Sequence, residues 1–215
     1  MRKLKSGITI LSLLLSMFQT HAQSSITLGA TIASPVRRDS YFDHIAYENK
    51  VYLNQDFSMP NYLLGFNMGL SAHLDNDFPI TFDFVYMRKV SKTKNEGTVG
   101  DRYGTYSAKL KRIIGSFTMG VSVFKNPRIG IGYDMGAFRI RWKKHGEGWS
   151  KMFNFPDILN GFSLYAVYDL KPIQFRPYFQ FFGVSDLLLD DGTKAYQFMS
   201  TNFGISISFM LKHDD

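Results

Sequence analysis

The chain contains no cysteine, which excludes disulfide bonds, thiolate metal sites and lipid attachment at a processed N-terminal cysteine. After residue 22 it also lacks any apolar run close to the ~18 residues that mark a membrane-spanning helix. If the mature chain lies in a membrane, it must span it as a closed β-barrel, because only helices and closed barrels satisfy every backbone group in lipid.

The first 22 residues have the pattern of a cleaved secretory signal peptide. Arg2, Lys3 and Lys5 precede an apolar run at 8–18, and small residues stand at the minus-three and minus-one positions of a cleavage site after Ala22. The run is shorter than the ~20 residues that a spanning helix needs. We expect residues 1–22 to be removed and residues 23–215 to form one domain, with 22 basic and 18 acidic residues and a net charge of +4.

Large apolar residues alternate with small polar ones along much of the mature chain. In 61–74, for example, Leu64 and Phe66 alternate with Gly65 and Asn67, as in a strand with one apolar and one small polar face. A small, uncharged second face suits the interior of a narrow barrel in lipid. Eight such segments are found, at 24–33, 61–74, 80–90, 107–124, 128–142, 161–169, 173–185 and 200–212.

The connections between these segments alternate in length. Short connections lie at 75–77, 125–127 and 170–172, and long ones lie at 34–60, 91–106, 143–160 and 186–199. Outer-membrane barrels have short turns on the periplasmic side and long loops outside. The sequence therefore predicts an all-β fold: an eight-stranded antiparallel up-and-down transmembrane β-barrel with short periplasmic turns and long extracellular loops.

Two positions interrupt the alternation. The apolar parity of 128–142 changes around Gly136 and Ala137, and a β-bulge would explain the change. Pro177 lacks an N–H group, so we expect a bulge or an irregular pairing there as well.

With these features the chain resembles the small eight-stranded bacterial outer-membrane barrels, the class that includes the OmpA and OmpX transmembrane domains. The resemblance extends over the mature chain, and its most specific element is the last strand. There Asn202, Gly204, Ile207 and Phe209 are similar to the polar-x-Gly-x-x-hydrophobic-x-hydrophobic signal of such barrels, although the chain continues beyond Phe209 to Asp215. The resemblance implies a bacterial outer-membrane location and recognition by the barrel assembly machinery.

Basic residues crowd the loop-side ends of three consecutive segments. They are Arg88, Lys89, Lys92, Lys94, Lys109, Lys111, Arg112, Arg139, Arg141, Lys143 and Lys144. Consecutive strands of an up-and-down barrel are neighbours, so we expect one positive patch at the outer rim, where lipopolysaccharide would present phosphates. The alternative is a lipid-adapted rim without a specific ligand.

Polar side chains also fall on the faces that should line the lumen. They are His73, Asp83, Asp134, Arg176, Tyr178 and Gln180. Charges this far from water need partners, and an eight-stranded barrel is only wide enough for its own side chains or one small ligand. We therefore expect an interior network that fills the lumen, with an open pore as the alternative.

Two other function classes deserve comparison with a structural barrel. Ser71 and His73 share one strand face, as the serine and histidine of some outer-membrane lipid hydrolases do, but their order is reversed and no orienting carboxylate is evident. A secreted, lipocalin-like barrel would instead turn its apolar faces inward around a ligand. We expect no catalytic residue, no metal, no cofactor and no nucleic-acid partner.

The long loops are the expected functional part, in adhesion, envelope integrity or contact with a surface partner. Aromatic residues gather there, at Tyr41, Phe42, Tyr47, Tyr52, Trp149, Phe153 and Phe155. Packing of the loops against one another is the equal alternative.

Overall fold

A computed structural model describes residues 22–35, 62–74, 79–98, 105–143, 148, 150–151, 158–188 and 194–213. The strands are β1 (Ala22–Pro35), β2 (Leu63–Leu74), β3 (Ile80–Thr98), β4 (Thr105–Val123), β5 (Arg128–Lys143), β6 (Ser150–Lys151), β7 (Leu159–Leu170), β8 (Ile173–Leu188) and β9 (Lys194–His213). The described part of the chain contains no helix long and apolar enough to cross a membrane. The expected signal peptide, except Ala22, and the loop aromatics lie outside the described residues.

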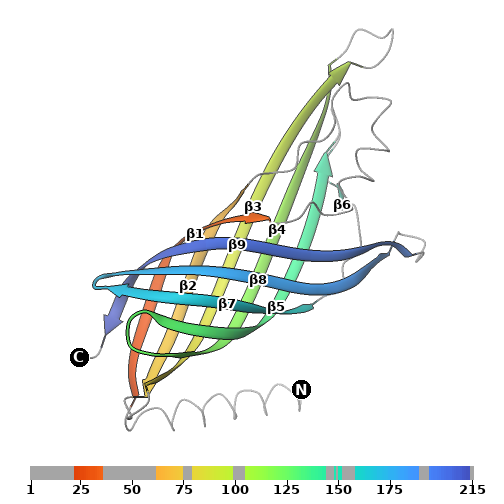
Figure 1. Cartoon of the computed structure of the whole chain (residues 1–215). Helices are drawn as coiled ribbons and strands as arrows, with labels where there is room; N and C mark the ends of the chain where they lie inside the picture. Colours follow the sequence, from red (N-terminus) through yellow and green to blue (C-terminus); the bar gives the residue numbers. More distant parts are fainter. Residues whose placement is uncertain are drawn as a thin grey trace, which may run out of the picture.

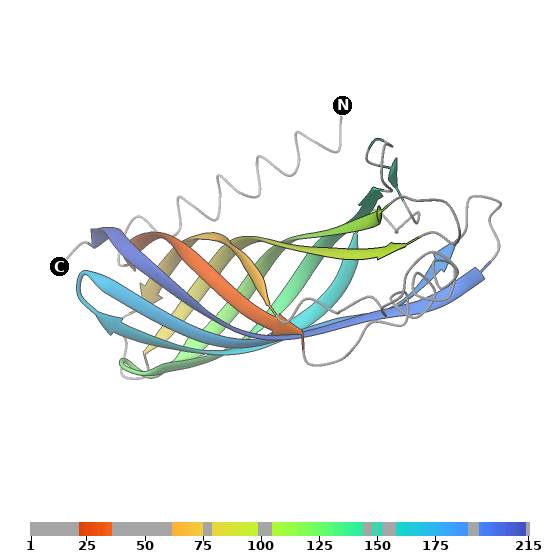
Figure 2. The ribbon, with the colours of Figure 1, turned by 90° about the horizontal axis from the view of Figure 1, so that it is seen from above.

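The eight long strands close into one barrel. Their order is β4-β3-β2-β1-β9-β8-β7-β5, and β4 also pairs with β5, which completes the ring. Every pairing is antiparallel. The β4–β5 and β7–β8 connections, the start of β1 and the end of β9 lie at the same end (Figure 2). The predicted eight-stranded antiparallel up-and-down barrel is therefore confirmed.

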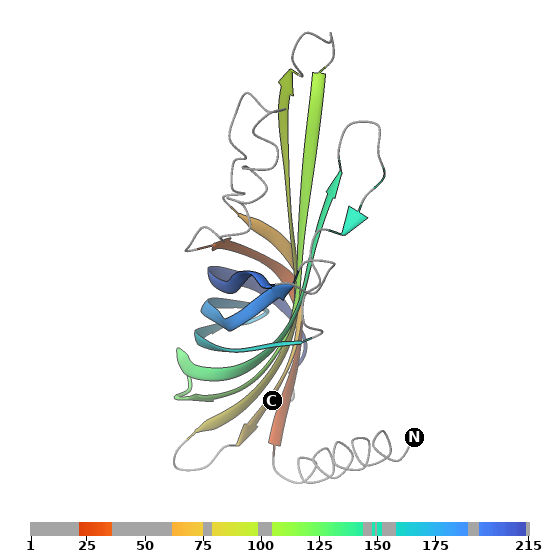
Figure 3. The same ribbon diagram turned by 90° about the vertical axis from the view of Figure 1, so that its right-hand side faces the viewer.

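The strands are longer at the loop side than the sequence indicates. The hairpin of β3 and β4 remains paired as far as Thr98 and Thr105 and projects beyond the barrel wall (Figures 1 and 3). The expected loop at 91–106 is thus mostly a hairpin, and β8 and β9 likewise remain paired to Leu188 and Lys194. Within the expected loop at 143–160, β6 forms a short additional strand that pairs with β5.

The prediction of a β-bulge at Gly136 is wrong. The register between β4 and β5 runs unbroken through Ser116↔Gly136 and Ile114↔Phe138. Phe138 faces the interior and Arg139 is exposed, so the chemistry of the two faces changes while the alternation continues. Physically, the strand here keeps its pairing and exchanges an apolar outer face for a cationic one.

The irregular pairing expected at Pro177 is confirmed. Between β7 and β8 the paired residues stop at Tyr165↔Tyr178 and resume at Tyr168↔Phe175, as expected where a proline lacks the N–H group. On its other side Pro177 pairs in register with Ile205 of β9. The ladder is therefore interrupted on one side without a register shift.

The two faces of the barrel wall differ sharply in chemistry. Outward residues such as Leu64, Ile131 and Leu164 are 51–59% exposed, whereas inward residues such as Ser71 and Thr118 are at most 5% exposed. Apolar side chains therefore face outward and polar ones face inward. This is the reverse of the lipocalin-like alternative, in which the apolar faces would surround a ligand.

Candidate functional site

The lumen near the short turns is filled by a hydrogen-bonded cluster centred on Asp83. One carboxylate oxygen of Asp83, Oδ1, accepts a hydrogen bond from Ser71 Oγ at 2.7 Å and lies 3.3 Å from Arg128 Nη1. The other oxygen, Oδ2, accepts from Ser122 Oγ and from the Tyr165 hydroxyl, both at 2.8 Å. The side chain of Asp83 is 1% exposed, so this carboxylate is compensated by protein groups instead of water.

Arg128 joins this cluster to a second carboxylate. Its Nε and Nη2 atoms each lie 3.1 Å from Asp169 Oδ2, while Nη1 faces Asp83. The guanidinium of Arg176 stacks 3.8 Å from the ring centroid of Tyr165. Two arginines thus balance the charges of two aspartates in the lumen near the short turns, which is the arrangement that a buried charge cluster requires.

A glycine allows Tyr165 to reach Asp83. A Cβ atom at Gly130 would come within 2.5 Å of the Tyr165 ring, so the ring lies directly against the backbone of β5. Without a side chain at 130, the ring can cross the lumen and place its hydroxyl on the carboxylate. The small inward residues that suggested a narrow barrel therefore make room for the large ones opposite them.

A second polar cluster lies farther from the short turns. Lys89 Nζ donates to Gln180 Oε1 at 2.7 Å and lies 5.1 Å from the ring centroid of Tyr178. Asp134 accepts a hydrogen bond from the Thr118 hydroxyl. Lys89, Gln180, Asp134 and Thr118 are each fully buried. The Lys89–Gln180 contact joins β3 to β8 across the interior, Gln180 Nε2 donates to Ser116 Oγ of β4 at 3.3 Å, and the Thr118–Asp134 contact joins the adjacent strands β4 and β5.

Two cations that the sequence assigns to the outer rim are inside the barrel. Lys89 and Arg112 are 0% and 1% exposed, and Arg112 Nη2 donates to Ser200 Oγ at 2.7 Å. The prediction that these two residues lie on the rim is therefore wrong. Both residues have the inward parity of their strands, and the run of adjacent outward cations in the sequence conceals this.

An apolar layer adjoins the second cluster toward the loop side. The rings of Phe138 and Phe182 meet edge to face, with centroids 4.9 Å apart. Leu63 and Ile114 are fully buried at the same end of the strands. The interior thus holds polar clusters toward the short turns and, toward the loop side, apolar side chains beside the buried Arg112–Ser200 contact.

The residues predicted for the lumen are placed there by the structure, with one partial exception. Asp83, Asp134, Arg176, Tyr178 and Gln180 are buried in the interior. His73 is half-buried, and its Nδ1 atom lies 2.9 Å from Thr81 Oγ1.

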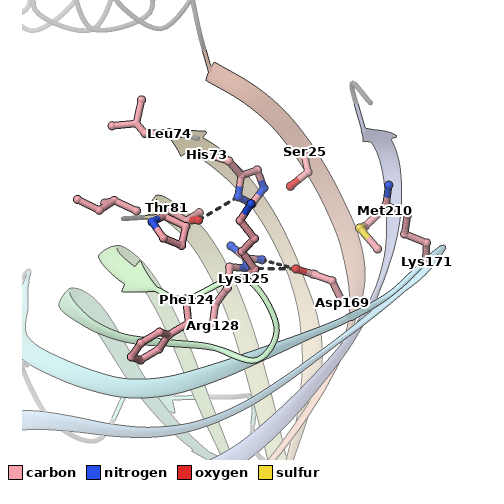
Figure 4. Close-up of a pocket in the computed structure, with 12 residues that line it drawn as sticks. Ser25, His73, Leu74, Thr81, Phe124, Lys125, Arg128, Asp169, Lys171 and Met210 are labelled. Atoms are coloured by element: carbon pink, nitrogen blue, oxygen red, sulfur yellow. Dashed lines mark hydrogen bonds and ion pairs between the residues drawn. The ribbon is translucent and has the colours of Figure 1, made fainter. Parts of the chain in front are cut away.

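His73 lines a pocket of about 270 Å³ at the short-turn end of the barrel. Arg128 and Asp169, which belong to the cluster centred on Asp83, also line it, together with Lys125 and Lys171 (Figure 4). The pocket is therefore the mouth of an interior that side chains close farther in.

The serine and histidine considered for catalysis do not contact each other in the hydrogen bonds described. Ser71 donates to Asp83, and the His73 ring contacts Thr81. Ser71 is 5% exposed. The serine hydroxyl thus serves the buried carboxylate and is poorly placed to meet a lipid substrate.

The remaining rim cations occupy rows of paired backbone positions on β3, β4 and β5. Backbone pairing places Lys92 opposite Lys111 and Lys111 opposite Arg141, and Arg141 pairs with Lys151 of β6. A second row consists of Lys94, Lys109 and Lys143. Arg88, Lys92, Arg139 and Arg141 are exposed and Lys111 is half-exposed; Lys144 lies outside the described residues.

The four residues of the expected assembly signal occupy both faces of β9. Asn202 and Gly204 face inward and are buried, whereas Ile207 and Phe209 face outward and are exposed. Gly204 allows close approach, since a Cβ atom there would lie 2.5 Å from the Tyr178 ring.

No family model matches the chain, and no curated protein matches it. Among solved structures it is similar to Ail, the attachment invasion locus protein of Yersinia pestis, with 11% identity, a TM-score of 0.48, and coverage of 89% of this chain and 100% of that one. Ail in complex with the heparin analogue sucrose octasulfate gives a TM-score of 0.47 with the same identity and coverage. Neisserial surface protein A gives 16% identity and a TM-score of 0.39, over 86% of this chain and 96% of that one.

Proposed function

We propose that this chain is an integral protein of the bacterial outer membrane, with a structural or surface-interaction role and no enzymatic activity. The observation that carries the proposal is the distribution of side chains across the barrel wall. Large apolar residues cover the outside, and paired or hydrogen-bonded polar residues fill the inside. A closed barrel with this distribution suits hydrocarbon as a solvent.

The apolar outer surface is too extensive for a water-soluble monomer. Leu28 on β1, Leu64 on β2, Ile131 on β5, Leu164 on β7 and Phe203 on β9 are all 47–59% exposed. Monomeric soluble proteins rarely expose contiguous apolar patches larger than a few hundred Å². A belt that follows the wall around the barrel is what lipid would cover.

The same arrangement supports the partners that we propose. Membrane lipid would contact the apolar belt, and the cationic rows at the loop side would meet the phosphates of lipopolysaccharide. The assembly machinery would read β9 at Asn202, Gly204, Ile207 and Phe209. The extracellular side would carry adhesion or envelope integrity, in contact with a surface partner.

Reconstitution of the mature chain tests this proposal. The refolded protein should need detergent or lipid to stay in solution and should migrate differently on gels before and after heating, because a folded membrane barrel resists detergent unfolding. In planar bilayers it should give no reproducible conductance steps, because the Asp83 and Lys89 clusters fill the lumen. Solubility without detergent would overturn the membrane assignment, and regular steps would overturn the filled lumen.

A further inference from the structure

We propose that the outer face of β3, β4 and β5 binds the phosphorylated sugar headgroup of an outer-leaflet glycolipid. The site that we assign is a notch at Gly115 and Ala137, with Arg88 and Arg139 beside it. This inference rests on the proposed membrane location, and it adds which face binds the lipid and where its phosphate lies.

Cations stand side by side on this face. Lys92, Lys111 and Arg141 stand directly opposite one another on adjacent strands, and side chains in such positions have Cβ atoms about 4.5–5.5 Å apart. Like charges directly opposite each other destabilise a sheet. No acidic residue occupies a register position in either described row, so an external anion would relieve the repulsion.

The notch is formed by two small residues on adjacent strands. Backbone pairing puts Arg88, Gly115 and Ala137 in one row across the three strands. A Cβ atom added at Gly115 would meet only the Tyr86 hydroxyl within 4 Å, at 3.8 Å. Two small residues therefore leave a shallow recess in the outer face, with an exposed arginine at one side and a tyrosine hydroxyl beside it.

The notch lies where the outer face changes from apolar to cationic. On the short-turn side of this row the outer face is apolar, with Phe117, Met119 and Tyr133 exposed. On the loop side the next outward row contains Val90, Ile113 and Arg139, and the row after it is wholly cationic, with Lys92, Lys111 and Arg141. The notch thus lies at the boundary between the two, where acyl chains would cover the belt and a headgroup phosphate would meet guanidinium groups that bind it well.

Among the outward side chains that the structure describes toward the loop side, the cations lie on β3, β4 and β5. The outward positions toward the loop side on β1, beside β2 and on β7 are Ser34, Tyr62 and Asn160, which are exposed and uncharged. A generic lipid-adapted rim would spread its cations around the ring. The grouping of the described cations on three neighbouring strands favours a discrete binding face.

Native mass spectrometry of the full mature protein in detergent, titrated with bisphosphorylated lipid A, tests the site. We expect stoichiometric binding to the wild type and at least tenfold weaker binding to Arg88→Gln/Arg139→Gln, which removes two charges from the face. Gly115→Leu/Ala137→Leu keeps every charge but fills the notch, and it should weaken binding similarly. The matched control, Lys125→Gln/Lys171→Gln, removes two charges at the opposite end and should bind as the wild type does.

Dephosphorylated lipid A and a soluble sulfated oligosaccharide complete the experiment. Binding of the dephosphorylated lipid as tightly as the parent lipid, or equal loss in the control variant, would overturn the proposal. Tighter binding of the sulfated oligosaccharide would also overturn it, in favour of a polysaccharide. Heat-dependent gel mobility is recorded for every variant: its absence in the wild type would reject the membrane proposal itself, whereas unchanged binding by folded variants would reject only this site.

Discussion

Replacing Leu164 with arginine should destabilise the folded barrel by about 2–4 kcal/mol in phospholipid bilayers, the cost of an arginine at the midplane of a barrel's lipid face. Leu164 lies midway along β7 and is 51% exposed. At an exposed position in water, the same substitution would change stability by only about 0.5 kcal/mol in either direction. Equilibrium urea unfolding in vesicles, followed by tryptophan fluorescence, measures the difference.

Leu170 provides a matched control on the same strand. It is the last residue of β7, beside the short turn, and is 60% exposed. Leu170→Arg should cost only about 0–1 kcal/mol, because the penalty falls toward the membrane interface. Equal costs at the two positions, or negligible cost at both, would contradict a lipid-facing belt.

Replacing Asp83 with asparagine should destabilise the barrel by about 3–5 kcal/mol, the cost of removing one partner of a buried ion pair. The substitution removes the negative charge that faces Arg128 at 3.3 Å, where both side chains are at most 2% exposed. The hydroxyls of Ser71, Ser122 and Tyr165 would also lose a charged acceptor. The same unfolding measurement reports the loss.

Asp169→Asn is the control for the buried cluster. Asp169 also pairs with Arg128, but its side chain is 23% exposed, so water can replace part of the contact and the cost should be about 1 kcal/mol. Adding Arg128→Gln to Asp83→Asn should recover part of the loss, because Arg128 is then no longer a buried cation that faces a neutral group, although Arg176 stays. A loss below that of Asp169→Asn would contradict the role of Asp83 as the centre of the cluster.

The barrel itself could be predicted because each strand of the wall alternates an apolar outward face with a small or polar inward face. That signal ends where the strands leave the apolar belt. Residues 91–98 of β3 carry lysines, threonines and a glutamate without an apolar face, so the sequence indicates a loop where the structure has a hairpin. The two residues of β6 are too few for any periodic pattern to appear.

The interior could be predicted by residue type but not by partner. The alternation of the strand alone would have predicted Lys89 on the inner face, since it shares a face with Asp83, Val85 and Met87. The neighbouring cations favoured the rim instead. Arg128 has the parity of Gly130 and Asp134 and could have been found in the same way. That Lys89 meets Gln180, 91 residues away, depends on the register of the closed ring, which no single segment specifies.

The absence of cysteine from the natural chain makes site-directed spin labelling the most direct test of the account. Single cysteines at Ile131, Leu164 and Ile207 would carry nitroxides on the outward belt, and one at Lys92 would carry a nitroxide on the cationic face. In vesicles, we predict that the belt labels are accessible to oxygen and shielded from an aqueous nickel chelate, and that the label at Lys92 shows the reverse. Nickel access at the belt equal to that at Lys92 would show that water, and not lipid, surrounds the barrel.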